Sequence, residues 1–175
     1  MKDQVRDGLL RSFRRLVEED GHLFDCPIEE HSSYDARKLH EVCVNHRLAN
    51  HLEEEIIPVL RIEDPLFVDI EFNREGVDLK NVRINGKDKT VRPDIIIHNR
   101  KTGAEKLNFL VVECKKRDAS KKDIEEDREK IRALMENERY EYSFGLQVVY
   151  RRDGVQGTLF FKSGGRIMSE TVDYS

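Results

Sequence analysis

The chain has few cysteines and no long apolar run, and each absence excludes a class of protein. Its three cysteines, Cys26, Cys43 and Cys114, form no C-x-x-C pair, so neither a disulfide framework nor a zinc knuckle is expected. No stretch approaches the roughly 18 apolar residues that a membrane span requires. Residues 1–22 are charged throughout and contain no apolar core of signal-peptide length. The sequence therefore predicts a cytoplasmic protein with reduced thiols and no membrane partner.

The chain also lacks an excess of positive charge. It has 31 Lys and Arg against 35 Asp and Glu, for a net charge of −4. This balance argues against a general basic coat for nucleic acid, so any phosphate-binding surface must be a local patch. With 38% charged and 38% hydrophobic residues, the composition is typical of a folded chain and not of a disordered one. At 175 residues we expect a single domain over residues 1–175.

Hydrophobic spacing predicts two helices in the first 60 residues. Apolar residues recur at helical intervals over residues 3–19, and Gly21 follows the last of them. A loop containing Pro27 leads to a longer helix that begins near Asp35. Pro58 marks the end of that helix or a kink near it.

The remaining chain predicts strands around one charged helix. Apolar and polar residues alternate from Phe67 to Asn73, as in a half-exposed strand, and the polar residues 73–90 are typical of a hairpin arm or mobile loop. Strands are then expected in "RPDIIIH" (92–98), "LNFLVVECK" (107–115), "YSFGLQVVYRR" (142–152) and "QGTLFFK" (156–162), with a helix over 118–138. This order predicts an α/β fold in which helices flank a mixed sheet.

Charged side chains stand at the ends of two apolar runs. Because side chains alternate along a strand, Glu113 and Lys115 share one face and Cys114 points to the other. If the strand after Asp94 pairs with this one, the two carboxylates approach each other near the strand ends. Close, partly desolvated carboxylates repel, and a divalent cation or a raised pKa relieves the repulsion. The alternative is a strand-end ion pair between Glu113 and Lys115, with Asp94 capping a turn.

Oxygen-only ligands suit Mg²⁺ or Mn²⁺. An ion held by Asp94, Glu113 and the backbone carbonyl of Cys114 could polarise a phosphodiester and lower the pKa of a bound water. Lys115 would then orient that water or stabilise the developing negative charge. Gln147 and Tyr150 lie on a predicted strand, Gln147 among apolar neighbours.

The segments "RPDIIIH" and "LVVECKK" resemble the P-D and E-x-K elements of the PD-(D/E)xK nuclease superfamily, which has the restriction-endonuclease fold. The core of that superfamily runs helix, three strands, helix, strand (α-β-β-β-α-β), which is the order predicted from residue 35 onward. The resemblance implies a core at about 35–162, with residues 1–34 as an additional N-terminal helix and loop. "LHEVCVNHRLANHLEEEI" and "VDIEFNR" are further similar to segments of a group of small uncharacterised bacterial proteins of this superfamily.

The resemblance implies a Mg²⁺-dependent nuclease, with DNA favoured over RNA as the substrate. It adds Glu41 to Asp94 and Glu113 as metal ligands and gives Lys115 the role of positioning the attacking water. Some members of the superfamily also place a Gln or Tyr near the metal, usually on a helix, which makes Gln147 and Tyr150 weaker candidates. Glu41 shares a helical row with Val44, which favours an orientation toward the sheet, although a first-turn acid stabilised by the helix dipole is equally compatible. Candidate phosphate contacts are Arg74, Arg92 and Lys116, in a locally basic region.

Two other functions stay open at this point. The first is a nucleic-acid-binding or scaffold module that has the nuclease fold and does not cleave. The second is a phosphohydrolase that acts on small molecules. Cleavage of both strands of a duplex would require two sites, which favours a homodimer.

Overall fold

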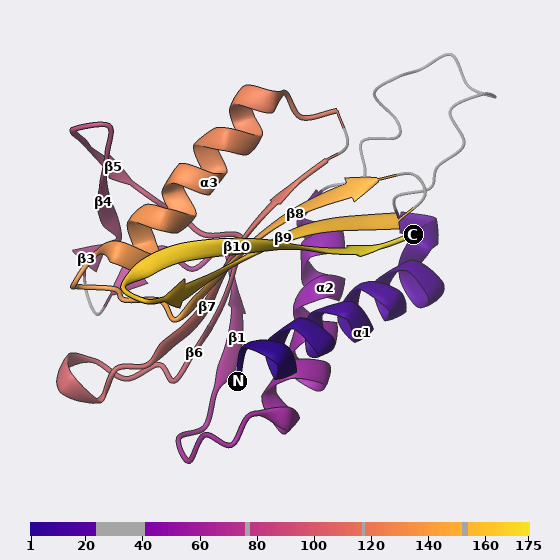
Figure 1. Cartoon of the computed structure of the whole chain (residues 1–175), viewed down its shortest axis with the longest axis horizontal. Helices are drawn as coiled ribbons and strands as arrows, with labels where there is room; N and C mark the ends of the chain where they lie inside the picture. The colour runs from indigo at the N-terminus through magenta and orange to yellow at the C-terminus, as the bar shows by residue number, and fades with distance from the viewer. Residues whose placement is uncertain (24–40, 76–77, 117, 152–153) are drawn as a thin grey trace.

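The structure is a computed structural model that describes residues 1–23, 41–75, 78–116, 118–151 and 154–175. Within these ranges the protein is a mixed α/β fold, with one mixed six-stranded sheet and three α-helices. Helices α1 and α2 cover one face of the sheet, and α3 covers the other (Figure 1). The α/β class and the mixed sheet expected from the sequence are therefore confirmed.

The two N-terminal helices pack against each other and against the sheet. Helix α1 spans Lys2–Asp20, as its periodicity predicts, and buries Leu9 and Phe13 completely. Helix α2 spans Glu41–Ile56, and a 3₁₀ turn at Ile57–Val59 contains Pro58. The helix start expected near Asp35 lies outside the described residues.

The strands of the sheet lie in the order β1-β6-β7-β8-β9-β10. β7 and β8 are parallel, because α3 (Lys121–Glu136) crosses between them, and the other neighbouring pairs are antiparallel. The Ser120 side chain and Asp123 form a capping box at the start of α3. The six strands are β1 (Phe67–Ile70), β6 (Ile95–His98), β7 (Asn108–Lys115), β8 (Phe144–Arg151), β9 (Gly154–Ser163) and β10 (Arg166–Tyr174).

The structure differs from the sequence expectation in two places. The first strand ends at Ile70, because Glu71 takes a positive φ of 50° and turns the chain. The sequence does not predict β10, because this edge strand buries only Val172 among its nine residues. For residues 73–90, expected to be a hairpin arm or a mobile loop, the structure has two hairpins, β2 (Arg74–Glu75) with β3 (Asp78–Leu79) and β4 (Asn81–Ile84) with β5 (Lys87–Thr90).

Two hydrophobic clusters lie on opposite faces of the sheet and fix which way each strand residue points. Ile95, Val112 and Cys114 belong to the cluster under α1 and α2. Ile96 and Val111 belong to the cluster under α3 and the β4–β5 hairpin. Glu113 alternates with Cys114 and pairs with Lys130 of α3, so it lies on the α3 face. The predicted separation of Glu113 from Cys114 is therefore confirmed.

Candidate functional site

Asp94 and Glu113 come from neighbouring strands. β6 pairs with β7, with Ile95 opposite Val112, so the predicted pairing of these two strands is confirmed. Asp94 immediately precedes β6, and its Oδ2 accepts a hydrogen bond from the backbone N–H of Cys114 at 2.7 Å. This bond holds the Asp94 carboxylate beside the end of β7, next to Glu113.

Glu113 is only 1% exposed and forms an ion pair with Lys130 of α3. Burial raises the pKa of Glu113 to about 8 against the opposing charge of Lys130, and the carboxylates of Asp94 and Asp127 add to the rise. Its Oε1 atom is buried without a hydrogen-bond partner. Burial also raises the pKa of Asp94, although the Cys114 amide and two lysines oppose this rise.

Lys115 pairs with Asp127, a residue that sequence reasoning did not identify. Lys115 Nζ lies 3.0 Å from Asp127 Oδ2, and Lys130 Nζ lies 3.7 Å from Asp127 Oδ1. Burial alone would lower the pKa of Lys115, but the hydrogen bond and charge of Asp127 outweigh burial and raise it. Asp127 stands four residues before the buried Ile131 of α3, so helical spacing could have marked it as facing the sheet.

Glu41, the first residue of α2, lies half-buried on the same side of the molecule. Burial raises its pKa, Asp94 raises it further, and Lys115 and Lys116 lower it. These electrostatic interactions agree with Figure 1, in which α2 and α3 both begin near the end of β7. We name the group of Glu41, Asp94, Glu113, Lys115, Asp127 and Lys130 the carboxylate site.

The oxygen donors of the carboxylate site suit a hard divalent ion, and the unpartnered Glu113 Oε1 leaves one donor atom open. The carboxylate oxygens of Glu41, Asp94 and Glu113 do not, however, all lie within 4.8 Å of one another. The ammonium groups of Lys130 and Lys115 contact Glu113 and Asp127 instead. The residue types therefore fit a metal, while their present spacing fits protein ion pairs.

Among the described residues, a single group has metal-ligand spacing, and it lies outside the carboxylate site: Glu19, Asp20 and His51. Asp20 Oδ1 accepts a hydrogen bond from Arg47 Nε at 2.8 Å, and Asp20 Oδ2 lies 2.7 Å from His51 Nε2. Both oxygens of this carboxylate thus have protein partners. No histidine-ligand spacing is visible in the sequence, because these residues come from two separate helices.

A polar row extends the carboxylate site across the sheet. Gln147 of β8 lies opposite Glu113, and Thr158 of β9 lies opposite Gln147. Arg128 of α3 donates to Gln147 Oε1 at 3.3 Å, while the buried Gln147 Nε2 has no partner. The weaker candidate Gln147 is therefore a direct neighbour of Glu113.

The predicted phosphate contacts separate into two groups. Arg92 lies 3.5 Å from Glu71, whose backbone N–H donates to the Asp94 carbonyl, so Arg92 is near the carboxylate site. Lys116 continues from Lys115 and interacts with Glu41. Arg74 instead lines a pocket with His98, at the opposite end of β6 from Asp94. Arg74 therefore lies apart from Asp94, because the chain turns after β1, and its expected role as a phosphate contact stays a prediction.

Comparisons of the chain with known proteins find no matching family model, no matching curated protein and no matching solved structure. None of the described helices is long and apolar enough to cross a membrane. The functional argument therefore depends on the residues and geometry described above.

Proposed function

We propose that the chain is a metal-dependent nuclease with a restriction-endonuclease-like core of the PD-(D/E)xK type, and that DNA is its substrate. The observation that carries this proposal is the pairing of β6 with β7, which brings Asp94 beside Glu113. The order α2, β1, β6, β7, α3, β8 supports it, because it matches the helix, three strands, helix, strand of that core once the two hairpins are set aside.

In this proposal Asp94, Glu113, Glu41 and the Cys114 carbonyl would hold one Mg²⁺ or Mn²⁺ ion. The bound ion would supply polarisation of the phosphodiester and a lowered pKa for the attacking water. Lys115 stabilises the negative charge that develops on the phosphate as the water oxygen bonds to phosphorus and one P–O bond breaks. Asp127 keeps Lys115 protonated and oriented.

The test is a cleavage assay on double-stranded DNA, single-stranded DNA and RNA, with Mg²⁺, Mn²⁺ or EDTA. We expect metal-dependent cleavage by the natural chain and a loss of at least about a hundredfold in the Asp94→Asn and Lys115→Met variants. Glu126→Gln is the matched control, because Glu126 is a solvent-exposed carboxylate that neighbours Asp127 in the sequence. Robust cleavage by either site variant, with its circular dichroism spectrum unchanged, would contradict the proposal.

One observation favours a second function, a nucleic-acid-binding or scaffold module that does not cleave. Lys130 and Lys115 already contact Glu113 and Asp127, as in a purely structural polar network. Calorimetric titration with Mn²⁺ separates the two functions. A nuclease binds the ion and loses it in Glu113→Gln, whereas a scaffold gives no heat of binding at millimolar Mn²⁺. Size-exclusion chromatography on DNA duplexes would further test the homodimer expected for double-strand cleavage.

A further inference from the structure

A second concentration of positive charge lies away from the carboxylate site. A pocket of about 180 Å³ opens near the C-terminal end of β6 and the β6–β7 connection. We name it the basic pocket, and its cationic or titratable lining residues are Arg74, Lys80, His98, Arg100, Lys101 and Lys106. Among the described residues no Asp or Glu lines it. Such a lining suits an anion.

Buried contacts hold the walls of the basic pocket in place. Lys80 is only 3% exposed, its Nζ lies 3.1 Å from the Tyr142 hydroxyl, and it stands 4.9 Å from the ring centroid of Phe72. Burial of an ammonium group costs free energy, so an ordered position of this kind needs specific partners. Asn108 Nδ2 also donates to the Tyr140 carbonyl at 2.6 Å. The pocket is therefore a built feature and not a chance gathering of mobile surface lysines.

Acidic residues outside the lining orient the cations. Asp69 accepts from Arg100 Nε at 2.9 Å and lies 2.8 Å from His98 Nε2, and Asp64 accepts from Lys101 Nζ at 2.9 Å. Burial lowers the pKa of His98, the hydrogen bond and charge of Asp69 oppose this effect, and the charges of Lys80 and Arg100 lower the pKa further. Asp69 thus holds both His98 and Arg100 at the wall of the pocket.

We propose that the basic pocket binds the dianionic phosphate of a phosphomonoester, carried by a nucleotide or by the end of a nucleic-acid strand. Arg and Lys side chains form strong charge-assisted hydrogen bonds to phosphate oxygens. A volume of about 180 Å³ accommodates one phosphate with part of its sugar and excludes a duplex.

This pocket is separate from the carboxylate site. Asn108, which lines it, and Glu113 stand at different points of β7. At about 3.3 Å per residue, the strand carries them roughly 17 Å apart. A phosphate in the basic pocket is therefore not the phosphate that the carboxylate site would hydrolyse, and the inference does not require the proposed nuclease activity.

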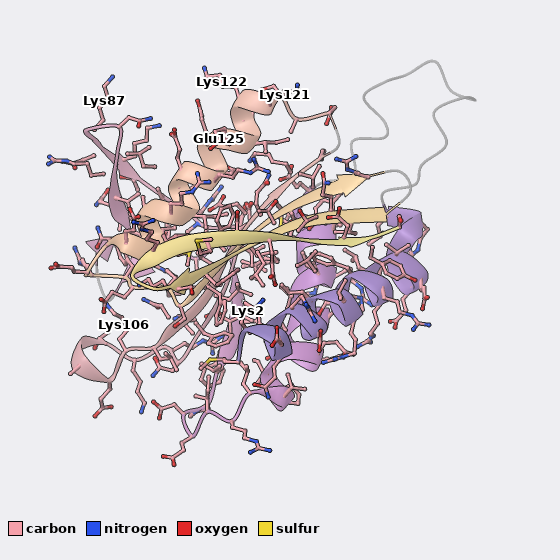
Figure 2. The ribbon with its side chains drawn as sticks, viewed as in Figure 1. Lys2, Lys87, Lys106, Lys121, Lys122 and Glu125 are labelled. Atoms are coloured by element: carbon pink, nitrogen blue, oxygen red, sulfur yellow. The ribbon has the colours of Figure 1, made fainter. Side chains whose placement is uncertain are left out.

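The test measures binding by calorimetry in EDTA, with inorganic phosphate, a nucleoside 5′-monophosphate and the matching nucleoside. We expect the two phosphates to bind and the nucleoside to bind at least about tenfold more weakly. The double variant Lys101→Gln/Lys106→Gln should weaken phosphate binding by at least about tenfold. Its matched control is Lys121→Gln/Lys122→Gln at the start of α3, which removes the same charge at a place well apart from Lys106, as the labels in Figure 2 show.

Absence of phosphate binding at millimolar concentration, or equal weakening by the control pair, would overturn the proposal. Lys80→Met should abolish phosphate binding if this variant folds. If it does not fold, the Lys101→Gln/Lys106→Gln variant alone tests the proposal. Asp94→Asn should bind phosphate as tightly as the natural chain. Phosphate binding therefore tests the basic pocket even if the nuclease proposal fails. Tighter binding of a 5′-phosphorylated oligonucleotide than of the nucleotide identifies a strand end as the ligand, and equal binding identifies a free nucleotide.

Discussion

Glu113 keeps a carboxyl group almost completely buried among other acids, and this links the stability of the protein to pH. Its pKa of about 8 lies above the ordinary value of 4.5, so the folded chain retains a proton that the unfolded chain has released. The stabilising effect is complete below the ordinary pKa and is lost as the pH rises through the folded pKa. Between these values this residue lowers the free energy of unfolding by about 1.4 kcal/mol per pH unit.

The variant Glu113→Gln has no such proton and should lack this contribution. We expect the free energy of unfolding of the natural chain, relative to the variant, to fall by about 2 kcal/mol from pH 5.5 to pH 7. Urea denaturation in EDTA at both pH values measures the difference. Glu126→Gln should follow the natural chain. Parallel profiles for natural chain and Glu113→Gln would show that the buried carboxyl titrates normally.

Lys130 and Glu113 should behave as one energetic unit. Removal of the ammonium leaves Glu113 buried without its counter-charge, so Lys130→Met should destabilise the fold by about 3 kcal/mol at pH 9, where Glu113 is largely ionised. In a Glu113→Gln background the same change should cost less than about 1 kcal/mol. A double-mutant cycle by urea denaturation gives the coupling energy. Additive effects of the two substitutions would contradict the ion pair.

The predictability of these residues differs for a physical reason. Asp94, Glu113 and Lys115 stand out in the sequence because a strand's period of two is local, and the neighbouring apolar runs fix their faces. Asp127 and Lys130 do not stand out, because their role depends on how α3 is rotated against the sheet. That rotation is a property of tertiary packing, which no window of the sequence contains.

At the level of elements, α3 completes the carboxylate site by carrying Asp127 to Lys115. In the nuclease assay Asp127→Asn should lower cleavage by about ten- to a hundredfold, because Lys115 loses the group that orients it. The loss should be larger at high pH, since burial without Asp127 lowers the pKa of Lys115. A pH profile of cleavage, with Glu126→Gln as control, measures both effects. An unchanged profile would exclude a positioning role for Asp127.

The close approach of α3 to β8 depends on one glycine. A Cβ atom at Gly145 would lie 2.2 Å from Ile131 Cγ2 and 3.0 Å from Met135 Sδ. Gly145→Ala should therefore push α3 outward and destabilise the fold by about 1–3 kcal/mol. Gly21→Ala is the control, because no atom lies within 4 Å of its added Cβ. Equal urea midpoints for both variants would show that α3 tolerates the displacement.

The elements themselves were predictable to different degrees. α1, β7 and β8 follow from strong periodicity or long apolar runs, and their observed bounds lie close to the expected ones. β10 could not be predicted, because an edge strand can pair with its neighbour through backbone hydrogen bonds alone. β10 has one buried residue, Val172, so its sequence lacks the apolar alternation of a strand. The position of Arg74 could not be predicted for a related reason. The turn at Glu71 and the two short hairpins change the direction of the chain, and no local sequence pattern encodes that change.

For the whole molecule, a net charge of −4 means that nucleic acid is attracted only to local patches. Arg92→Gln and Lys116→Gln should each weaken DNA binding similarly for all sequences and reduce the slope of log affinity against log salt by about 1. Fluorescence anisotropy over a salt series measures this slope. Arg83→Gln is the control, because Arg83 pairs with Asp88 on the β4–β5 hairpin. If all three variants gave the same slope, the contacts would not be local.

The packing of α1 has a practical consequence for anyone who trims the chain. The segment that resembles the nuclease core, residues 35–162, contains neither α1 nor β10, yet Phe13 and Val172 belong to the same hydrophobic cluster as the central strands β7 and β8. A fragment that consists of that segment alone would expose to water the apolar sheet face that α1 covers. Exposed apolar patches of this kind drive aggregation. Attempts to isolate a minimal folded fragment should therefore keep the first helix and the last strand.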